Sequence, residues 1–170
     1  PPWKMTLSSC CETTIGAAFG CPFEGEMPVE RVVEIVQRVA DAHPFEIALA
    51  DTIGVGVPAQ VTELVSRVRE AVPGIPLRCH FHNTRNTGLA NAFAAVQAGV
   101  RTLDASLGGI GGCPFAPAAT GNIPTEDLVY MLRRSGYETG ISLDRAIETG
   151  KWLQQQLGRP RRHPERSRSA

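Results

Sequence analysis

The sequence predicts an α/β protein whose strands form a parallel sheet of the kind found in (β/α)8 barrels. Helical stripes of apolar residues alternate with short apolar runs along the chain, and such alternation is typical of parallel strands with right-handed crossovers. Polar residues gather just after several of the apolar runs, where a barrel keeps its active site. No glycine-rich dinucleotide motif follows any expected strand, so an open doubly wound sheet is the less favoured alternative.

The expected elements are four strand–helix units and a terminal helix. The strands are expected at Met5 to Ser9 (followed by a long loop), Phe45 to Ala50, Leu77 to His82 and Val100 to Leu107. Apolar positions at helical spacing mark the helices: Val29, Val32, Val33, Val36 and Val39; Val61, Leu64, Val65 and Val68 after Pro58; Leu89, Ala92, Phe93 and Val96; and Leu128 to Leu132. Ser142 is a favourable N-cap for the terminal helix.

Composition sets the class of protein. The chain of 170 residues is 42% hydrophobic and 20% charged, which fits about one soluble domain. No apolar run reaches the roughly 18 residues that a membrane helix needs, and the start lacks a signal-peptide pattern. The 5 cysteines are an odd number and do not suggest a disulfide framework. We therefore expect a cytoplasmic protein that does not enter a membrane, and the excess of Arg over Lys suggests a bacterial source.

The net charge of zero hides a basic tail. Residues 159–170 contain five of the 17 basic residues and one of the 17 acidic ones, so the remainder carries 12 − 16 = −4. An acidic body argues against a nucleic-acid-binding protein. The tail is rich in Arg, Pro and Ser, which predicts one domain over residues 1–158 and a disordered tail over residues 159–170.

The sharpest local motif is His80-Phe81-His82. Residues i and i+2 of a strand point to the same face, so both imidazoles would project to one side at the end of an expected strand. Two such histidines can chelate a divalent metal, although an octahedral site needs oxygen ligands as well. The alternative is a pair of hydrogen-bonded histidines without a metal.

A glycine-rich segment, Gly108-Gly109-Ile110-Gly111-Gly112, leads to Cys113. So many glycines indicate a loop, and Gly109, Gly111 and Gly112 are candidate substrate-loop residues. Cys113 at its tip is a candidate acid, base or nucleophile, with a buried structural thiol as the alternative. No Walker motif is present, because no Gly-Lys-Ser/Thr occurs.

Two further polar residues stand at the ends of expected elements. Asp51 closes a strand and precedes Thr52-Ile53-Gly54, so it is a candidate catalytic residue or a cap of the following turn. Asn122 lies just before the helix opened by Pro124. It is either the N-cap of that helix or a metal ligand through its side-chain oxygen.

Taken together, these residues resemble the hydroxymethylglutaryl-CoA lyase family of metal-dependent barrels, from about Leu7 to Leu157. The resemblance rests on six segments in order: Gly20 to Gly25, Asp51 to Gly56, His80 to His82, Gly88 to Asn91, Gly109 to Ala116, and Gly121-Asn122 with Thr125 to Tyr130. It implies that His80, His82 and Asn122 bind Mg²⁺ or Mn²⁺. It also implies that Cys113 serves in acid–base chemistry and that Asp51 lies near the substrate.

The resemblance has two departures. The family carries an Arg-Asp-Gly segment at the end of its first barrel strand, and no Asp-Gly pair occurs here. We therefore expect this chain to hold the second half of the barrel, to need the N-terminal half or a partner chain, and to have little activity alone. Asn83 stands where many relatives have Asp, a change that bears on the support of the metal ligands.

The implied activity is retro-aldol cleavage of 3-hydroxy-3-methylglutaryl-CoA, or a related 3-hydroxyacyl-CoA, to acetyl-CoA and a keto acid, as in leucine degradation. A homo-oligomer is also expected. Two alternatives stay open. One is a condensing enzyme of the isopropylmalate or homocitrate synthase type, which lacks the loop cysteine. The other is an inactive half-barrel that serves as an interaction subunit.

Overall fold

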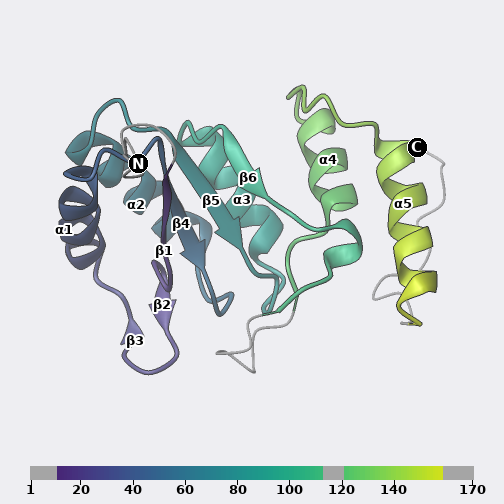
Figure 1. The fold of residues 1–170 in the computed structure, drawn as a ribbon, viewed down its shortest axis with the longest axis horizontal. Coiled ribbons are helices and arrows are strands. Elements are labelled where there is room, and N and C mark those ends of the chain that lie inside the picture. Colours follow the sequence, from purple (N-terminus) through teal and green to yellow (C-terminus); the bar gives the residue numbers. More distant parts are fainter. Residues whose placement is uncertain (1–10, 113–120, 159–170) are drawn as a thin grey trace, which may run out of the picture.

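A four-stranded parallel sheet forms the centre of the protein (Figure 1). The computed structural model describes residues 11–112 and 121–158. The strands are β1 (Glu12–Ile15), β4 (Glu46–Asp51), β5 (Leu77–Phe81) and β6 (Thr102–Asp104), in the order β1-β4-β5-β6. All three neighbouring pairs are parallel, so the loops after these strands meet at one edge of the sheet.

Five helices accompany the sheet in the described part of the chain. They are α1 (Val29–Ala40), α2 (Pro58–Ala71), α3 (Gly88–Gln97), α4 (Thr125–Arg134) and α5 (Leu143–Gln156), with a short 3₁₀ turn η1 (Leu107–Gly109) and a small hairpin of β2 (Gly20–Cys21) and β3 (Gly25–Glu26). Helices α1, α2 and α3 pack on one another along one face of the sheet, and α4 and α5 follow beyond β6 (Figure 1). The predicted order of four strand–helix units and a terminal helix is thus confirmed, although the first strand, β1, is not at the residues expected for it.

The core lies between the sheet and these helices, and its residues are those that the periodicity predicts. Val61, Leu64, Val65 and Val68 of α2 are all buried. In β5, Leu77, Cys79 and Phe81 are buried, whereas Arg78 and His80 between them are partly exposed. Buried and partly exposed positions thus alternate along β5, as expected for a strand with helices on one face. Ser142 caps α5, because its hydroxyl accepts a hydrogen bond from Arg145 N at 3.4 Å.

Two predictions about strands need correction. The long loop expected after residue 9 contains strand β1, whose β-branched Thr13, Thr14 and Ile15 suit a strand. The strand expected over residues 100–107 extends only over Thr102–Asp104, because Leu107 already begins the turn η1. The strand expected at Met5 to Ser9 and the tail 159–170 lie outside the described residues.

Within the described ranges, no helix combines the length and the apolar character needed to cross a membrane.

Candidate active site

The structure places His80, His82 and Asn122 together at the end of β5. His82 pairs with Asn122 through an isolated antiparallel bridge. On either side of it, Asn83 N donates to Gly121 O at 3.1 Å, and Ile123 N donates to Phe81 O at 3.4 Å. Backbone hydrogen bonds therefore hold residues 121–123 beside the histidine motif, although the two segments are distant in the sequence.

The two imidazoles lie edge to face, with ring centroids 5.1 Å apart and planes inclined by 72°. His82 is buried with 4% of its surface exposed, and the side chain of His80 is 27% exposed. Burial lowers the pKa of His82, and the neighbouring His80 lowers it further. His82 is therefore neutral near pH 7, and the neutral imidazole is the form that binds a metal.

Two buried polar atoms of this group lack a hydrogen-bond partner in the described part of the chain. His82 Nδ1 and Asn122 Oδ1 find no hydrogen-bond partner among residues 11–112 and 121–158. Buried polar atoms are nearly always satisfied, and imidazole nitrogen and amide oxygen are both ligands of divalent cations. The residues present thus fit part of a metal site. No cluster of three or more His, Cys, Asp and Glu side chains suited to a metal occurs in the described part, so the set is incomplete.

The glycine-rich loop starts beside Asn122. Asn122 Nδ2 donates a hydrogen bond to Ile110 O at 3.1 Å. Gly111 has a φ of +126°, and a Cβ at this position would lie 2.5 Å from Asn122 Nδ2. Glycine is therefore needed here for a close approach as well as for its backbone conformation. Cys113, two residues further on, lies outside the described residues.

Asp51 is fully buried, and its carboxylate accepts hydrogen bonds from the turn between β4 and α2. Its Oδ1 accepts from Val55 N at 3.0 Å and its Oδ2 from Gly56 N at 2.9 Å, while Asn91 Nδ2 donates to Gly56 O at 2.8 Å. Burial raises the pKa of Asp51, and these N–H groups partly offset that rise. Asp51 thus makes the contacts of a turn cap, which the sequence analysis gave as the alternative to a catalytic role. It also lies close enough to His82 for an electrostatic interaction.

Sequence reasoning missed Asp104, which lies next to His80. Asp104 Oδ2 is 3.3 Å from His80 Nδ1, because the register of β5 and β6 pairs these two residues. Nothing in the local sequence around Asp104 shows this contact, since it depends on which strands are neighbours.

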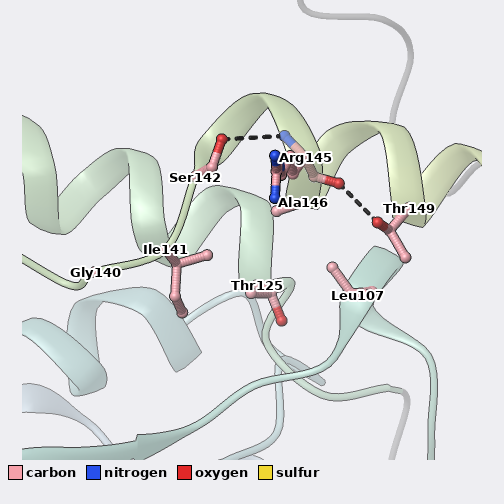
Figure 2. A pocket seen from close by; sticks show the side chains of 8 residues that line it. All are labelled: Leu107, Thr125, Gly140, Ile141, Ser142, Arg145, Ala146 and Thr149. Atoms are coloured by element: carbon pink, nitrogen blue, oxygen red, sulfur yellow. Dashed lines mark hydrogen bonds between the residues drawn. The ribbon is translucent and has the colours of Figure 1, made fainter.

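A cavity of about 490 Å³ lies elsewhere, between η1 and the N-terminal halves of α4 and α5. Figure 2 shows Leu107, Thr125 and Ile141 in its wall, with the N-cap bond between Ser142 and Arg145 at one side. Neither histidine of the motif nor Asn122 lines it, so this cavity is separate from the candidate site.

Comparison with known proteins identifies the family. The HMGL-like family model matches residues 6–152. The (R)-citramalyl-CoA lyase of Chloroflexus aurantiacus is 53% identical over 146 residues, which are 86% of this chain and 46% of that protein. The hydroxymethylglutaryl-CoA lyase YngG of Bacillus subtilis is 38% identical over 86% of this chain and 49% of its own. The chain thus spans about half the length of the curated relatives that it matches.

Comparison with solved structures indicates the same family. An HMG-CoA lyase from Acinetobacter baumannii, in complex with coenzyme A and 3-methylmalate, superposes with a TM-score of 0.85 at 44% identity, over 89% of this chain and 50% of that one. The hydroxymethylglutaryl-CoA lyase from Pseudomonas aeruginosa gives a TM-score of 0.82 at 33% identity, over 88% and 50% of the two chains. The chain belongs to the HMGL-like family, and its four strand–helix units are part of the TIM barrel of that superfamily.

Proposed function

We propose that this chain is the part of a carbon–carbon lyase that holds two histidines, an asparagine and a loop cysteine of the active site. Its substrate would be the CoA thioester of a 3-hydroxy-3-methyl dicarboxylic acid, such as 3-hydroxy-3-methylglutaryl-CoA or citramalyl-CoA. The observation that supports this best is the proximity of His80, His82 and Asn122, in which the buried atoms His82 Nδ1 and Asn122 Oδ1 have no hydrogen-bond partner among the described residues.

The reaction breaks the bond between C2 and C3 of the acyl chain. The 3-hydroxyl loses its proton and becomes the carbonyl of a keto acid, and C2 leaves as the enolate of acetyl-CoA and takes up a proton. A divalent cation, Mg²⁺ or Mn²⁺, held by His80, His82 and Asn122 would lower the pKa of that hydroxyl. Cys113 is the proposed acid for the enolate.

The remaining site residues have supporting roles in this proposal. Gly109 and Gly111 have positive φ angles of +65° and +126° and, with Gly112, let the loop pass close to Asn122 and the substrate. Asp51 holds the turn after β4 through Val55 N and Gly56 N, and so shapes the rim near His82.

A complete site needs more than this chain. Among the described residues, the outer edges of β1 and β6 have no strand neighbour, and the metal ligands are incomplete. We propose that the N-terminal half of the barrel, in the same polypeptide or as a partner chain, supplies the missing strands and an oxygen ligand.

The test is an assay of the chain together with an N-terminal half-barrel, taken from its own coding region or from the Chloroflexus relative. Acetyl-CoA and keto acid release is measured with both thioesters. Activity on either one supports the proposal. Release of free CoA from acetyl-CoA and a keto acid, without cleavage of either thioester, would instead identify a condensing enzyme, and no turnover in any assay would favour an inactive interaction subunit.

Two variants test the assigned residues in that complex. His80→Ala should abolish Mg²⁺ and Mn²⁺ binding in calorimetry, and unchanged affinity would contradict the metal assignment. Cys113→Ser should lower kcat by about 10²–10⁴-fold, as expected for a lost proton-transfer group, with little change in thermal midpoint. Cys21→Ser is the matched control, because Cys21-Pro22-Phe23 repeats the residues of Cys113-Pro114-Phe115. It should leave kcat unchanged.

A further inference from the structure

We propose that Asp104 is a positioning residue that fixes the tautomer of His80, and that Arg78 holds Asp104 in place for this task. The inference rests on the proposed function, in which His80 is a metal ligand. One carboxylate oxygen, Oδ2, lies 3.3 Å from His80 Nδ1, and the other, Oδ1, lies 3.4 Å from Arg78 Nη1.

The strand register places the three side chains side by side. His80 is paired with Asp104 across β5 and β6, and Arg78 is two residues before His80 on the same face of β5. All three are partly shielded, with 17% of the Arg78 side chain, 27% of His80 and 34% of Asp104 exposed. A contact in this setting is less weakened by water than one at the open surface.

Arg78 is itself fixed from the other strands. Its Nη2 lies 3.0 Å from Glu12 Oε1 on β1. Its Nε lies 3.3 Å from Glu46 Oε2 on β4, which is an ion-pair distance, although this buried nitrogen makes no hydrogen bond among the described residues. The planar guanidinium has its donors in a rigid arrangement, so these two contacts limit where Nη1 points. Nη1 faces Asp104 Oδ1, which leaves Oδ2 for His80.

The consequence concerns the proton of the neutral imidazole. A carboxylate beside Nδ1 favours the tautomer with its hydrogen on Nδ1, and the lone pair then lies on Nε2. Histidine ligands of metals are commonly oriented in this way by a carboxylate. His80 would thus be prepared as an Nε2 ligand before any metal arrives, so the effect is measurable in the metal-free protein.

The test is ¹⁵N NMR of the histidine side chains in the metal-free 170-residue chain. The His80 signals are assigned with a His80→Gln variant. We expect the Nδ1–H tautomer in the native chain and mainly Nε2–H in Asp104→Ala. Asp104→Asn, which keeps a side-chain oxygen and nearly the same shape, should give an intermediate mixture and also serves if the alanine variant misfolds.

Glu34→Gln is the matched control. It removes one negative charge that pairs with Arg31 on α1, outside the Arg78 network, so it should leave the tautomer unchanged. A native chain that already shows mainly Nε2–H at His80 would overturn the proposal. A native-like spectrum of the Asp104 variants with an unaltered tautomer, or an equal change in Glu34→Gln, would also overturn it.

Metal affinity gives a second measurement that separates this inference from the proposed function. In the chain complexed with its N-terminal half, Asp104→Ala should weaken Mn²⁺ binding by about 10–100-fold, as read from the electron paramagnetic resonance signal of free Mn²⁺. Glu34→Gln should bind as the native complex does. If the native complex binds no Mn²⁺, the proposed metal site fails, while the tautomer measurement still decides the role of Asp104.

Discussion

Both carboxylate oxygens of Glu126 accept a hydrogen bond from the backbone N–H of Gly108, each at 3.0 Å. Glu126 lies in the first turn of α4, and Gly108 lies in η1, where the glycine-rich loop begins. Gly150 of α5 packs against the same carboxylate so closely that a Cβ there would collide with Glu126 Oε1. One side chain therefore connects the start of the loop with the two last helices.

Replacing Glu126 with Ala should destabilise the protein. A hydrogen bond to a charged group contributes roughly 1.5–3 kcal/mol, and we expect the free energy of unfolding in urea to fall by about that amount. Asp127→Ala is the control, because Asp127 is an acidic residue of the same first turn and its removal has the same effect on the helix dipole. An equal loss in both variants would show that the contact with Gly108 contributes nothing.

Gly150→Ala should also destabilise the protein, although alanine is favoured over glycine in a helix by about 1 kcal/mol. The new methyl group would displace the Glu126 carboxylate from Gly108 N. In the Glu126→Ala background this obstacle is gone, so Gly150→Ala should become neutral or stabilising there. Urea unfolding of the four proteins in a double-mutant cycle measures the coupling, and additive effects of the two changes would contradict the packing argument.

The elements that the sequence predicts well are those with local signals. The valines of α1 and α2 repeat at helical spacing, and β5 alternates between buried and partly exposed positions, so each pattern can be read within one short segment. Strand β1 was missed because its sequence, Glu-Thr-Thr-Ile, contains no apolar run and only Ile15 is buried. Its four backbone pairs with β4 define it, and these pairs form only in the folded sheet.

The same distinction applies to the candidate site. His80 and His82 stand in one motif, so their common side follows from strand geometry. Asn122 enters the site through an isolated bridge to His82, and the sequence indicated this neighbour only through a family resemblance. The contact between His80 and Asp104 depends on the register of β5 and β6, which no local pattern contains.

Arg78→Met should leave three carboxylates, those of Glu12, Glu46 and Asp104, without their shared cation. We expect a loss of unfolding free energy of about 1–3 kcal/mol at pH 7, because charged groups become unpaired in a partly buried place. Urea unfolding of the two proteins measures this.

The control for Arg78 is Arg31→Met. Arg31 pairs with Glu34 at 2.9 Å, and both side chains are 56% exposed, so its loss should cost less than about 1 kcal/mol. A loss for Arg78→Met as small as this one would show that the network is not important for stability.

Cys79 should resist alkylation in the folded protein. Its side chain is buried between β5 and the helices, and burial raises the pKa of this thiol from 9.0 to about 12, with a further contribution from Asp104. The thiolate is the reactive form, so at pH 8 only about one Cys79 thiol in 10⁴ is reactive. Iodoacetamide followed by mass spectrometry should find Cys11 and Cys21, which are partly exposed, labelled before Cys79. Equal labelling of all three without denaturant would contradict this assignment.

The same shift predicts that Cys79 weakens the fold at alkaline pH. Below about pH 9 the thiol is protonated in both the folded and the unfolded chain, and its ionisation has no effect on stability. Between 9.0 and about 12 the unfolded chain loses this proton while the folded chain keeps it, so unfolding is favoured as pH rises. Cys79→Ala removes this contribution, and its unfolding free energy should decline less from pH 8 to pH 10.5, by a difference on the order of 2 kcal/mol. The cavity left by the smaller side chain lowers the unfolding free energy of Cys79→Ala at every pH, so comparing the change with pH within each protein removes its effect. Equal declines in the two proteins would show that Cys79 ionises alike in the folded and unfolded states.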